Sequence, residues 1–157
     1  MDETMTVVYV DADACPVKEE VYRVAARHDL PVKLVANARM WKPPDAWIEL
    51  VIVPSLGDDA DDWIVEHCLP GDVVVTNDIP LADRCLKKGA RALAPTGHVH
   101  TTENICSTLA TRDLMSHLRD MGVIDGGGPP PFTKKDRSRF LQNLDEQIRA
   151  IARSATK

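Results

Sequence analysis

The sequence lacks the segments that would place a protein in a membrane or send it out of the cell. No apolar stretch approaches the roughly 20 residues that a transmembrane helix needs, and the N-terminus has no apolar h-region of a secretory signal. The four cysteines are widely scattered and include no C-x-x-C pair. We therefore expect a cytoplasmic protein with reduced cysteines and no membrane partner.

The sequence also lacks a net positive charge and an internal repeat. Its formal net charge is −5 at pH 7, with a pI near 5.5. Without a global basic field, any binding of nucleic acid must come from a local patch. The chain has 157 residues, of which 44% are hydrophobic, and this is typical of one domain with a sizeable core. A single domain over residues 1–157 is expected.

Short apolar segments alternate with helical patterns over the first 100 residues. The segments that read as strands are 6–10, 31–36, 47–53, 71–76 and 90–94. The first helical pattern has Pro16 as its first helical residue, and two others cover 59–68 and 81–88, the last closed by Gly89. Because strands and helices alternate, the pattern predicts an α/β fold, a three-layer α/β/α domain with a central, mainly parallel sheet.

Two longer helical patterns occupy the C-terminal third. The first, 104–121, has an apolar side and ends at Gly122. The Gly/Pro-rich stretch 126–131 follows, which can be neither helix nor strand. Residues 134–155 form a charged amphipathic pattern, which predicts a helix packed on the domain. The apolar positions of this last pattern are Phe140, Leu141, Leu144, Ile148 and Ile151.

Aspartates follow three of the predicted strands. Parallel strands present their carboxyl ends at the same edge of a sheet, where ligands bind in open α/β folds. Helix caps explain some of these carboxylates, because Asp58 with Asp61 mimics a capping box and Asp78 can be an N-cap. Their number exceeds that need. The sequence therefore predicts a catalytic acidic site made of Asp11, Asp13, Asp58, Asp61 and Asp78, with Asp62 and Asp83 as spare candidates.

Clustered carboxylates imply a cation. They raise one another's pKa unless a divalent ion neutralises them, and hard oxygen ligands suit Mg²⁺ or Mn²⁺ rather than zinc. Such ions position phosphates and activate water for in-line displacement. The pattern therefore predicts phosphodiester or phosphomonoester chemistry. The predicted metal ligands are Asp11, Asp13 and Asp78, while Asp58 and Asp61 complete the shell or orient water.

A phosphatase is one alternative. The segment VVYVDADACPV is close to the signature of haloacid-dehalogenase-like phosphotransferases, with Asp11 as nucleophile and Asp13 as acid/base. The order of motifs argues against it, because the Ser/Thr and Lys motifs of that superfamily precede its final acidic pair. Here the segment GDDADD comes before Thr76 and the later lysines. In addition, Cys15 stands where Thr or Val is usual.

The combination of motifs resembles a PIN-like nuclease domain instead. In such domains an Asp after the first strand, an acid in a middle helix and an Asp in a T-x-D segment share the metal. More narrowly, DADACPVK, LVAN, TNDIPLA, KGARAL, RDLM and KKDRSRFL are similar to the YaiI/YqxD family over nearly the entire chain. The resemblance implies a PIN-like fold and a metal-dependent nuclease, expected to act on RNA. A noncatalytic nucleic-acid-binding protein that kept the fold is the second alternative.

Two local groups are candidates for contact with RNA. The first follows the second predicted strand and consists of Asn37, Arg39 and Lys42. These side chains could bind phosphates, and a base could stack on the neighbouring Trp41. The other begins the last helix and is the best candidate for a polynucleotide track: Lys134, Lys135, Arg137 and Arg139. For the first group, solvated loop charges are an equally good explanation. For the second, the ordinary charged first turn of an amphipathic helix is an equally good one.

Two further motifs have modest interpretations. Cys15 precedes a predicted helix, where a thiolate would be favoured, but no resolving cysteine is near, so a small buried residue is predicted. His98 and His100 share one face of an extended segment and could form half of a zinc site. No third ligand is legible, and a surface hairpin is predicted.

Overall fold

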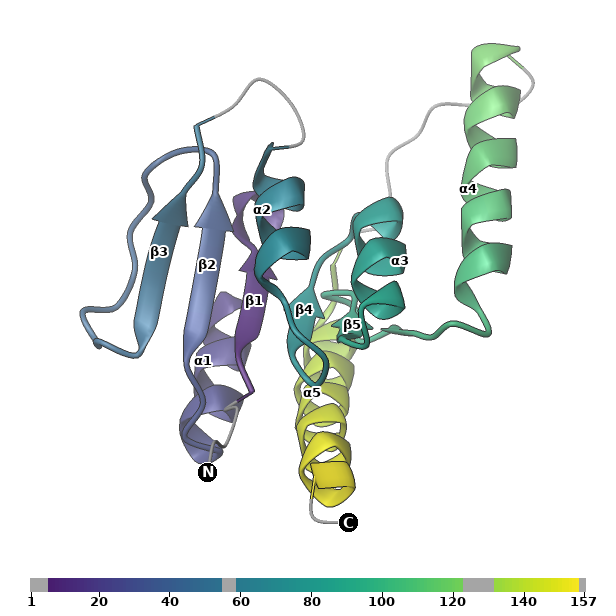
Figure 1. The fold of residues 1–157 in the computed structure, drawn as a ribbon. Coiled ribbons are helices and arrows are strands. Elements are labelled where there is room, and N and C mark those ends of the chain that lie inside the picture. The colour runs from purple at the N-terminus through teal and green to yellow at the C-terminus, as the bar shows by residue number, and fades with distance from the viewer. Residues whose placement is uncertain (1–5, 55–58, 123–131, 156–157) are drawn as a thin grey trace.

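The protein is described by a computed structural model that covers residues 6–54, 59–122 and 132–155 (Figure 1). Within these residues, six strands form one sheet in the order β3-β2-β1-β4-β5-β6. Strands β1 to β5 are parallel, and β6 runs antiparallel to β5. The strands are β1 (Val8–Asp11), β2 (Val32–Ala36), β3 (Ile48–Ile52), β4 (Val73–Val75), β5 (Arg91–Leu93) and β6 (Val99–His100).

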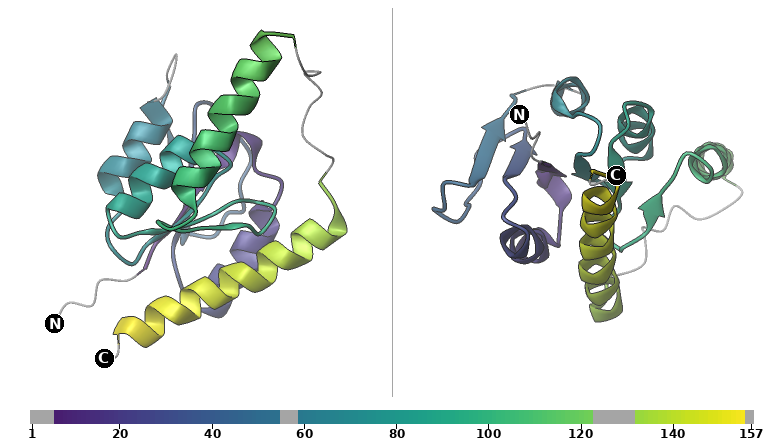
Figure 2. Two further views of the ribbon diagram at one scale, coloured as in Figure 1. Left: turned by 90° about the vertical axis from the view of Figure 1, so that its right-hand side faces the viewer. Right: turned by 60° about the horizontal axis from the view of Figure 1, so that its bottom comes forward.

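Helices cover both faces of the sheet, which confirms the predicted three-layer α/β/α architecture. Helices α1 and α5 lie on one face and α2 and α3 on the other, with α4 beyond α3 (Figure 2). The helices are α1 (Lys18–Arg27), α2 (Asp59–His67), α3 (Ile79–Lys87), α4 (Ile105–Asp120) and α5 (Lys134–Ala155), with a short 3-10 helix η1 (Ala12–Ala14).

Strand β1 shows why the central strands are apolar on both faces. Val8 and Val10 are buried in the core under α1 and α5, whereas Tyr9 is buried in the core under α2 and α3. Successive strand residues point to opposite faces, so a strand with helices above and below must be apolar throughout. The predicted packing of the last helix is confirmed, because Phe140, Leu144 and Ile148 are buried.

The start of the first helix differs from the prediction. Pro16 does not begin it: the chain makes the 3-10 helix η1 after β1, and α1 starts only at Lys18. Asp11 is therefore the last residue of β1, and Asp13 lies within η1. The Asp11 carboxylate is therefore positioned by strand β1, whereas the Asp13 carboxylate is positioned by the connection between β1 and α1.

The remaining predictions of local structure are mostly confirmed. Gly89 and Gly122 have positive φ angles of 92° and 74° after α3 and α4, as expected of residues that end helices. The hairpin at His98 and His100 is formed by β5 and β6, but its surface position was wrong for His100, which is buried. Cys15 is buried as predicted, and all four cysteines are free thiols.

Helix α4 carries large apolar side chains that are exposed. Its first residue, Ile105, is buried against α3, but Leu114 in the helix and Met121 just after it are 56% and 60% exposed. Figure 1 shows α4 extending away from the sheet. Among the described helices, none combines the length and apolar character that crossing a membrane would require. The Gly/Pro-rich stretch 126–131 lies outside the described residues.

Candidate acidic site

Two of the predicted acidic residues, Asp11 and Asp78, lie at the carboxyl edge of the sheet, between β1 and β4. From β1 the chain continues to β2 and β3 on one side, whereas β4 and β5 lie on the other side. Between β1 and β4 the direction in which strands are added therefore reverses. In open α/β sheets this reversal leaves a crevice at the carboxyl ends of the strands, and ligands bind there. Asp11 ends β1 and Thr76 directly follows β4, so both stand at the crevice.

Thr76 joins two of the aspartates. Its hydroxyl donates a hydrogen bond to Oδ2 of Asp11 at 2.8 Å, and its Oγ1 accepts one from the backbone N–H of Asp78 at 2.9 Å. Thr76 is buried, and its own backbone N–H donates to the carbonyl of Leu93 in β5. The hydroxyl therefore fixes the orientation of the Asp11 carboxylate. Sequence reasoning did not include Thr76 among the site residues, although the T-x-D segment was a usable signal.

Asp78 has a structural role as well as a place at the site. Its Oδ1 accepts a hydrogen bond from the backbone N–H of Leu81 at 3.0 Å, and Pro80 lies in the first turn of α3. The N-cap that the sequence predicted is therefore present. One oxygen is enough for the cap, so capping does not conflict with a role for the second oxygen.

Asp13 is held from the other side of β1. Both of its carboxylate oxygens lie within hydrogen-bond distance of the backbone N–H of Asn37, at 3.3 and 3.1 Å. Asn37 directly follows β2, which is the neighbour of β1 in the sheet. The Asp13 side chain is exposed, so it stands at the mouth of the crevice. Asn37, predicted to contact RNA, thus also positions a carboxylate through its backbone.

The electrostatic environment of Asp11 is unfavourable for its charge. Burial raises the pKa of this carboxyl above its usual value, the Thr76 hydrogen bond lowers it, and the charges of Asp78 and Asp13 raise it further. The net direction is upward, so the single hydroxyl does not compensate for lost hydration and two nearby negative charges. A cation at this edge would reverse the balance and keep the Asp11 carboxylate ionised.

The other acidic candidates are not brought to Asp11 in the same way. Asp61 lies in the first turn of α2 and is half-buried, whereas Asp58 lies outside the described residues. Asp62 pairs with Arg84 at 2.9 Å, and Asp83 pairs with Lys87 at 3.0 Å. These two spare candidates therefore take part in ion pairs on α2 and α3.

No group of three or more His, Cys, Asp or Glu side chains has a metal-binding arrangement within residues 6–54, 59–122 and 132–155. Asp58 lies outside these residues. Mg²⁺ is commonly held by one or two carboxylates, with waters and substrate phosphate oxygens as its other ligands. The oxygens of Asp11 and Asp78 suit that mode of binding, because they are hard donors and the charge of Asp78 raises the pKa of Asp11.

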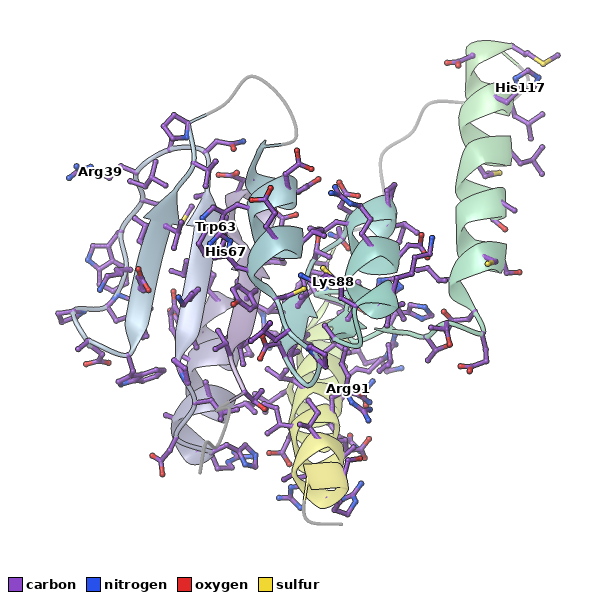
Figure 3. All side chains as sticks on the ribbon, viewed as in Figure 1. Arg39, Trp63, His67, Lys88, Arg91 and His117 are labelled. Carbon is purple, nitrogen blue, oxygen red and sulfur yellow. The ribbon has the colours of Figure 1, made fainter. Side chains whose placement is uncertain are left out.

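The first basic group lies in the connection from β2 to β3. Arg39 is exposed at the carboxyl edge of the sheet (Figure 3), and the Trp41 side chain is 79% exposed. Lys42 is half-buried, and its Nζ donates to the carbonyl of Pro43 at 2.9 Å. The loop thus presents a cation and an aromatic ring to solvent next to Asn37, which holds Asp13.

The second basic group begins α5 and lies close to the connection that carries Asp13. Arg137 Nη1 donates to the carbonyl of Pro16 at 2.9 Å and pairs with Glu20 at 3.2 Å. Its guanidinium also lies over the ring of Phe132, 5.0 Å from the centroid. Arg137 therefore anchors α5 to the start of α1, and its charge is partly neutralised.

Three other cations of this group are exposed. Lys134 and Lys135 are in the first turn of α5, and Arg139 follows one turn later. The backbone of Arg139 packs closely on Gly97, so this residue also has a structural contact. The two lysines are consequently the members of the group whose described environment is most open to a polyanion.

Comparison with known proteins agrees with the motifs. A family model described as "Uncharacterized BCR, YaiI/YqxD family" matches residues 9–150. A UPF0178 protein of Rhodopseudomonas palustris is 56% identical over 153 residues, which cover 98% of this chain and 96% of the relative. A UPF0178 protein of Rhodospirillum centenum is 55% identical over 149 residues, covering 93% and 97%. No solved structure matches the chain. With the family match spanning β1 to α5, this chain belongs to the YaiI/YqxD family.

Proposed function

We propose that this protein is a PIN-like, divalent-metal-dependent nuclease that acts on RNA. The observation that carries the proposal is the pair of aspartates, Asp11 and Asp78, joined through the Thr76 hydroxyl at the switch point of the sheet. Asp13 adds a third carboxylate, held there by the Asn37 amide. A hydrogen-bonded group that brings negative charges together in a crevice at the carboxyl edge of the sheet is suited to holding a cation.

In this proposal Asp11 and Asp78 hold Mg²⁺ or Mn²⁺ through their carboxylate oxygens. Such an ion, when bound, neutralises phosphate charge and makes a bound water more acidic. Thr76 keeps Asp11 in one orientation, and the α3 cap does the same for Asp78. Asp13 is exposed and fixed by a backbone amide, so one of its oxygen lone pairs can orient the attacking water. Asp61, on the first turn of α2, is the candidate for completing the shell.

The choice of RNA rests on the surroundings of the acidic site. Arg39 and the exposed Trp41 follow β2, beyond the amide that holds Asp13, and can supply a phosphate contact and a stacking surface. On the other side, Arg137 fixes the start of α5 beside Pro16, and with it Lys134 and Lys135. Cations of this acidic protein thus lie in the loop after β2, whose Asn37 holds Asp13, and at the start of α5, which Arg137 joins to Pro16.

The test is cleavage and binding of a fluorescent single-stranded RNA by purified protein in Mg²⁺ or Mn²⁺. Losing an outer-shell partner of a metal ligand costs up to about 100-fold in activity. Because Asp11 is proposed as a direct ligand, Asp11→Asn should reduce cleavage by more than that. Its binding to RNA should be unchanged or tighter, because a negative charge facing phosphate is removed. Asp45→Asn is the matched control, since Asp45 is an exposed aspartate in the β2–β3 connection outside the hydrogen-bonded group.

The basic residues are tested by the opposite change. Replacing Lys134 and Lys135 by Gln should weaken RNA binding and reduce the slope of log K against log salt by about 0.7 for each phosphate that is no longer neutralised. Lys87→Gln, at an exposed lysine of α3, is the control. Salt-sensitive binding without cleavage in either metal would replace the nuclease by a noncatalytic binding protein. An aspartyl-phosphate trapped at Asp11 with a phosphate mimic would establish the phosphatase instead.

A further inference from the structure

Strand β3 forms one edge of the sheet. It pairs with β2 on one side, and among the described elements no strand or helix lies along its other side (Figure 1). β3 has five residues, whereas β6, the strand at the opposite edge, has two. Edge strands expose backbone N–H and C=O groups to which another strand can add. The length of β3 therefore makes it the edge at which such pairing is possible.

The backbone of β3 faces two ways. The carbonyl of Trp47 accepts from the N–H of Val32 at 2.9 Å, and the N–H of Val53 donates to the carbonyl of Ala36 at 2.8 Å. Successive residues of a strand direct their backbone groups to opposite sides, so the odd-numbered residues from 47 to 53 face β2. The residues whose backbone groups face away from the sheet are therefore Ile48, Leu50 and Ile52.

Two of these residues have free backbone groups. The N–H of Ile48 donates to the Asp45 carbonyl at 3.1 Å, where the β2–β3 connection reaches the edge. Within the described residues, no hydrogen bond is made by the outward N–H and C=O groups of Leu50 and Ile52. Leu50 is half-buried, and Ile52 is 38% exposed. Two donors and two acceptors thus face outward from the middle and the end of the strand.

β3 lacks the features by which edge strands usually avoid pairing. Such strands are very short, carry lysine or proline, or contain a bulge. Residues 48–52 include neither lysine nor proline, and the register with β2 is continuous over all five residues. The one charged residue, Glu49, turns its backbone toward β2, and its carboxylate pairs with Lys33 at 3.5 Å. The edge is therefore able to accept a partner strand.

A second copy of β3 fits this edge when it runs antiparallel about a two-fold axis, the commonest symmetry of homodimers. Charges and hydrogen bonds select one register. An axis at Glu49 would place two carboxylates opposite each other, which is destabilising. An axis at Leu50 would direct the Ile52 carbonyl to an N–H that is already bonded, that of Ile48. An axis at Val51 pairs Leu50 of each copy with Ile52 of the other.

The register about Val51 satisfies the free backbone groups of both copies. In an antiparallel pair, opposed residues exchange both of their backbone bonds, so the two Leu50–Ile52 pairs form four hydrogen bonds. The opposed side chains are also compatible. Leu50 lies opposite Ile52, and Val51 lies opposite its own copy. Glu49 lies opposite Val53, so no like charges are opposed.

We propose that the protein forms a weak homodimer by antiparallel pairing of the two β3 strands about Val51, so that two six-stranded sheets become one continuous sheet. The contact extends over about 17 Å of strand, which puts it in the small, reversible class of interfaces. Each copy has a net charge of −5, so added salt should strengthen the dimer by screening repulsion. The acidic crevice lies between β1 and β4, and the proposal does not depend on nuclease activity.

The experiment is sedimentation of the full chain from about 10 μM to about 1 mM, the range of weak association, with amide hydrogen exchange at both concentrations. We expect a monomer at the low concentration and a growing fraction of dimer above it. The amides of Leu50 and Ile52 should exchange at least about tenfold more slowly in the dimer, because their N–H groups become bonded. The amides of Glu49 and Val51 already face β2, so their exchange should change little.

A pair of charge variants tests the register. Residue 53 of one copy faces Glu49 of the other, and this contact occurs twice in the dimer. Val53→Lys should therefore self-associate about tenfold more tightly than Val53→Glu, since opposite charges replace like charges at both contacts. Leu69→Lys and Leu69→Glu are the matched controls, because Leu69 is 49% exposed after α2 and gives the same changes in net charge. The two controls should dimerise within about twofold of each other.

A proline variant tests the backbone bonds. Ile52→Pro removes an N–H that the folded monomer does not use, and edge strands tolerate proline at such positions. The variant should keep its circular dichroism spectrum and remain monomeric; if it does not fold, the Val53 pair still decides. A monomer throughout the concentration range, a dimer whose Leu50 and Ile52 amides exchange as in the monomer, or equal self-association of Val53→Lys and Val53→Glu would overturn the proposal.

Discussion

Replacing Thr76 by valine is the sharpest test of how the acidic site is held together. Valine keeps the volume of threonine but removes the hydroxyl, which donates to Asp11 at 2.8 Å and accepts from the Asp78 N–H at 2.9 Å. Because Thr76 is only 1% exposed, water does not replace the lost bonds freely. Both Asp11 and Asp78 should therefore lose a partner at once.

The expected loss of stability follows from the two bonds. A hydrogen bond to an ionised group contributes about 1.5–3 kcal/mol, and a neutral one contributes about 1 kcal/mol. The added methyl group offsets about 0.8 kcal/mol by apolar burial. Thr76→Val should thus lower the free energy of unfolding by about 2–3 kcal/mol near neutral pH. For a chain of this size, Tm should fall by about 5–10 °C.

The loss should depend on pH with a definite sign. The pKa of Asp11 is already raised, mainly by burial, and the Thr76 bond lowers it, so removing the hydroxyl should raise that pKa further. A protonated Asp11 does not need the Thr76 donor. The part of the deficit that comes from Asp11 is therefore fully present above the pKa of Asp11 in the variant. It is lost as the pH falls toward the pKa in the unmodified protein.

Urea denaturation followed by circular dichroism at a series of pH values measures this dependence. Thr76→Ser is the control, because it keeps the hydroxyl and loses only a methyl group, which should cost about 1 kcal/mol. An equal deficit for the two variants, or a Thr76→Val deficit that does not shrink with falling pH, would refute the hydrogen-bonded link between Thr76 and Asp11. In a nuclease assay, Thr76→Val should also require more Mg²⁺ than Thr76→Ser.

Two further predictions concern the rest of the domain. Gly97→Ala should destabilise the fold by about 2 kcal/mol or more, because φ is +96° and a Cβ would lie 2.7 Å from Cγ of Arg139 and 2.9 Å from the Phe140 nitrogen. Gly122→Ala, with φ of +74° and nothing within 4 Å, should cost only about 1–2 kcal/mol in thermal melting; equal costs would contradict the close packing at Gly97. Asp145→Asn should reduce stability at neutral pH, because burial raises the pKa of Asp145 but His28, Arg149 and Arg27 together hold it below its usual value. The difference from the unmodified protein should disappear as acid titration passes through that lowered pKa, and a difference that persists in acid would show that charge is not its source.

Local sequence patterns determined the secondary structure of this protein to a large extent. The helical spacing of apolar residues placed the last helix at 134–155, which are the bounds of α5. Glycines after helices and the aspartate before α3 marked termini correctly, because capping uses neighbouring residues only. The alternation of strands and helices also led to the parallel sheet, and with it to the edge at which aspartates gather.

Only the tertiary structure decided which partner each polar group has. Thr76 and Asp11 are 65 residues apart, and their bond depends on β4 lying next to β1. The same holds for Arg137, a candidate for the polynucleotide track that is paired with Glu20, and for His100, which was predicted on a surface hairpin and is buried. The spacing of apolar residues along a helix or strand indicates which of its residues face the core and which face solvent. The pairing and burial of a charge depend on elements distant in sequence, which no local pattern encodes.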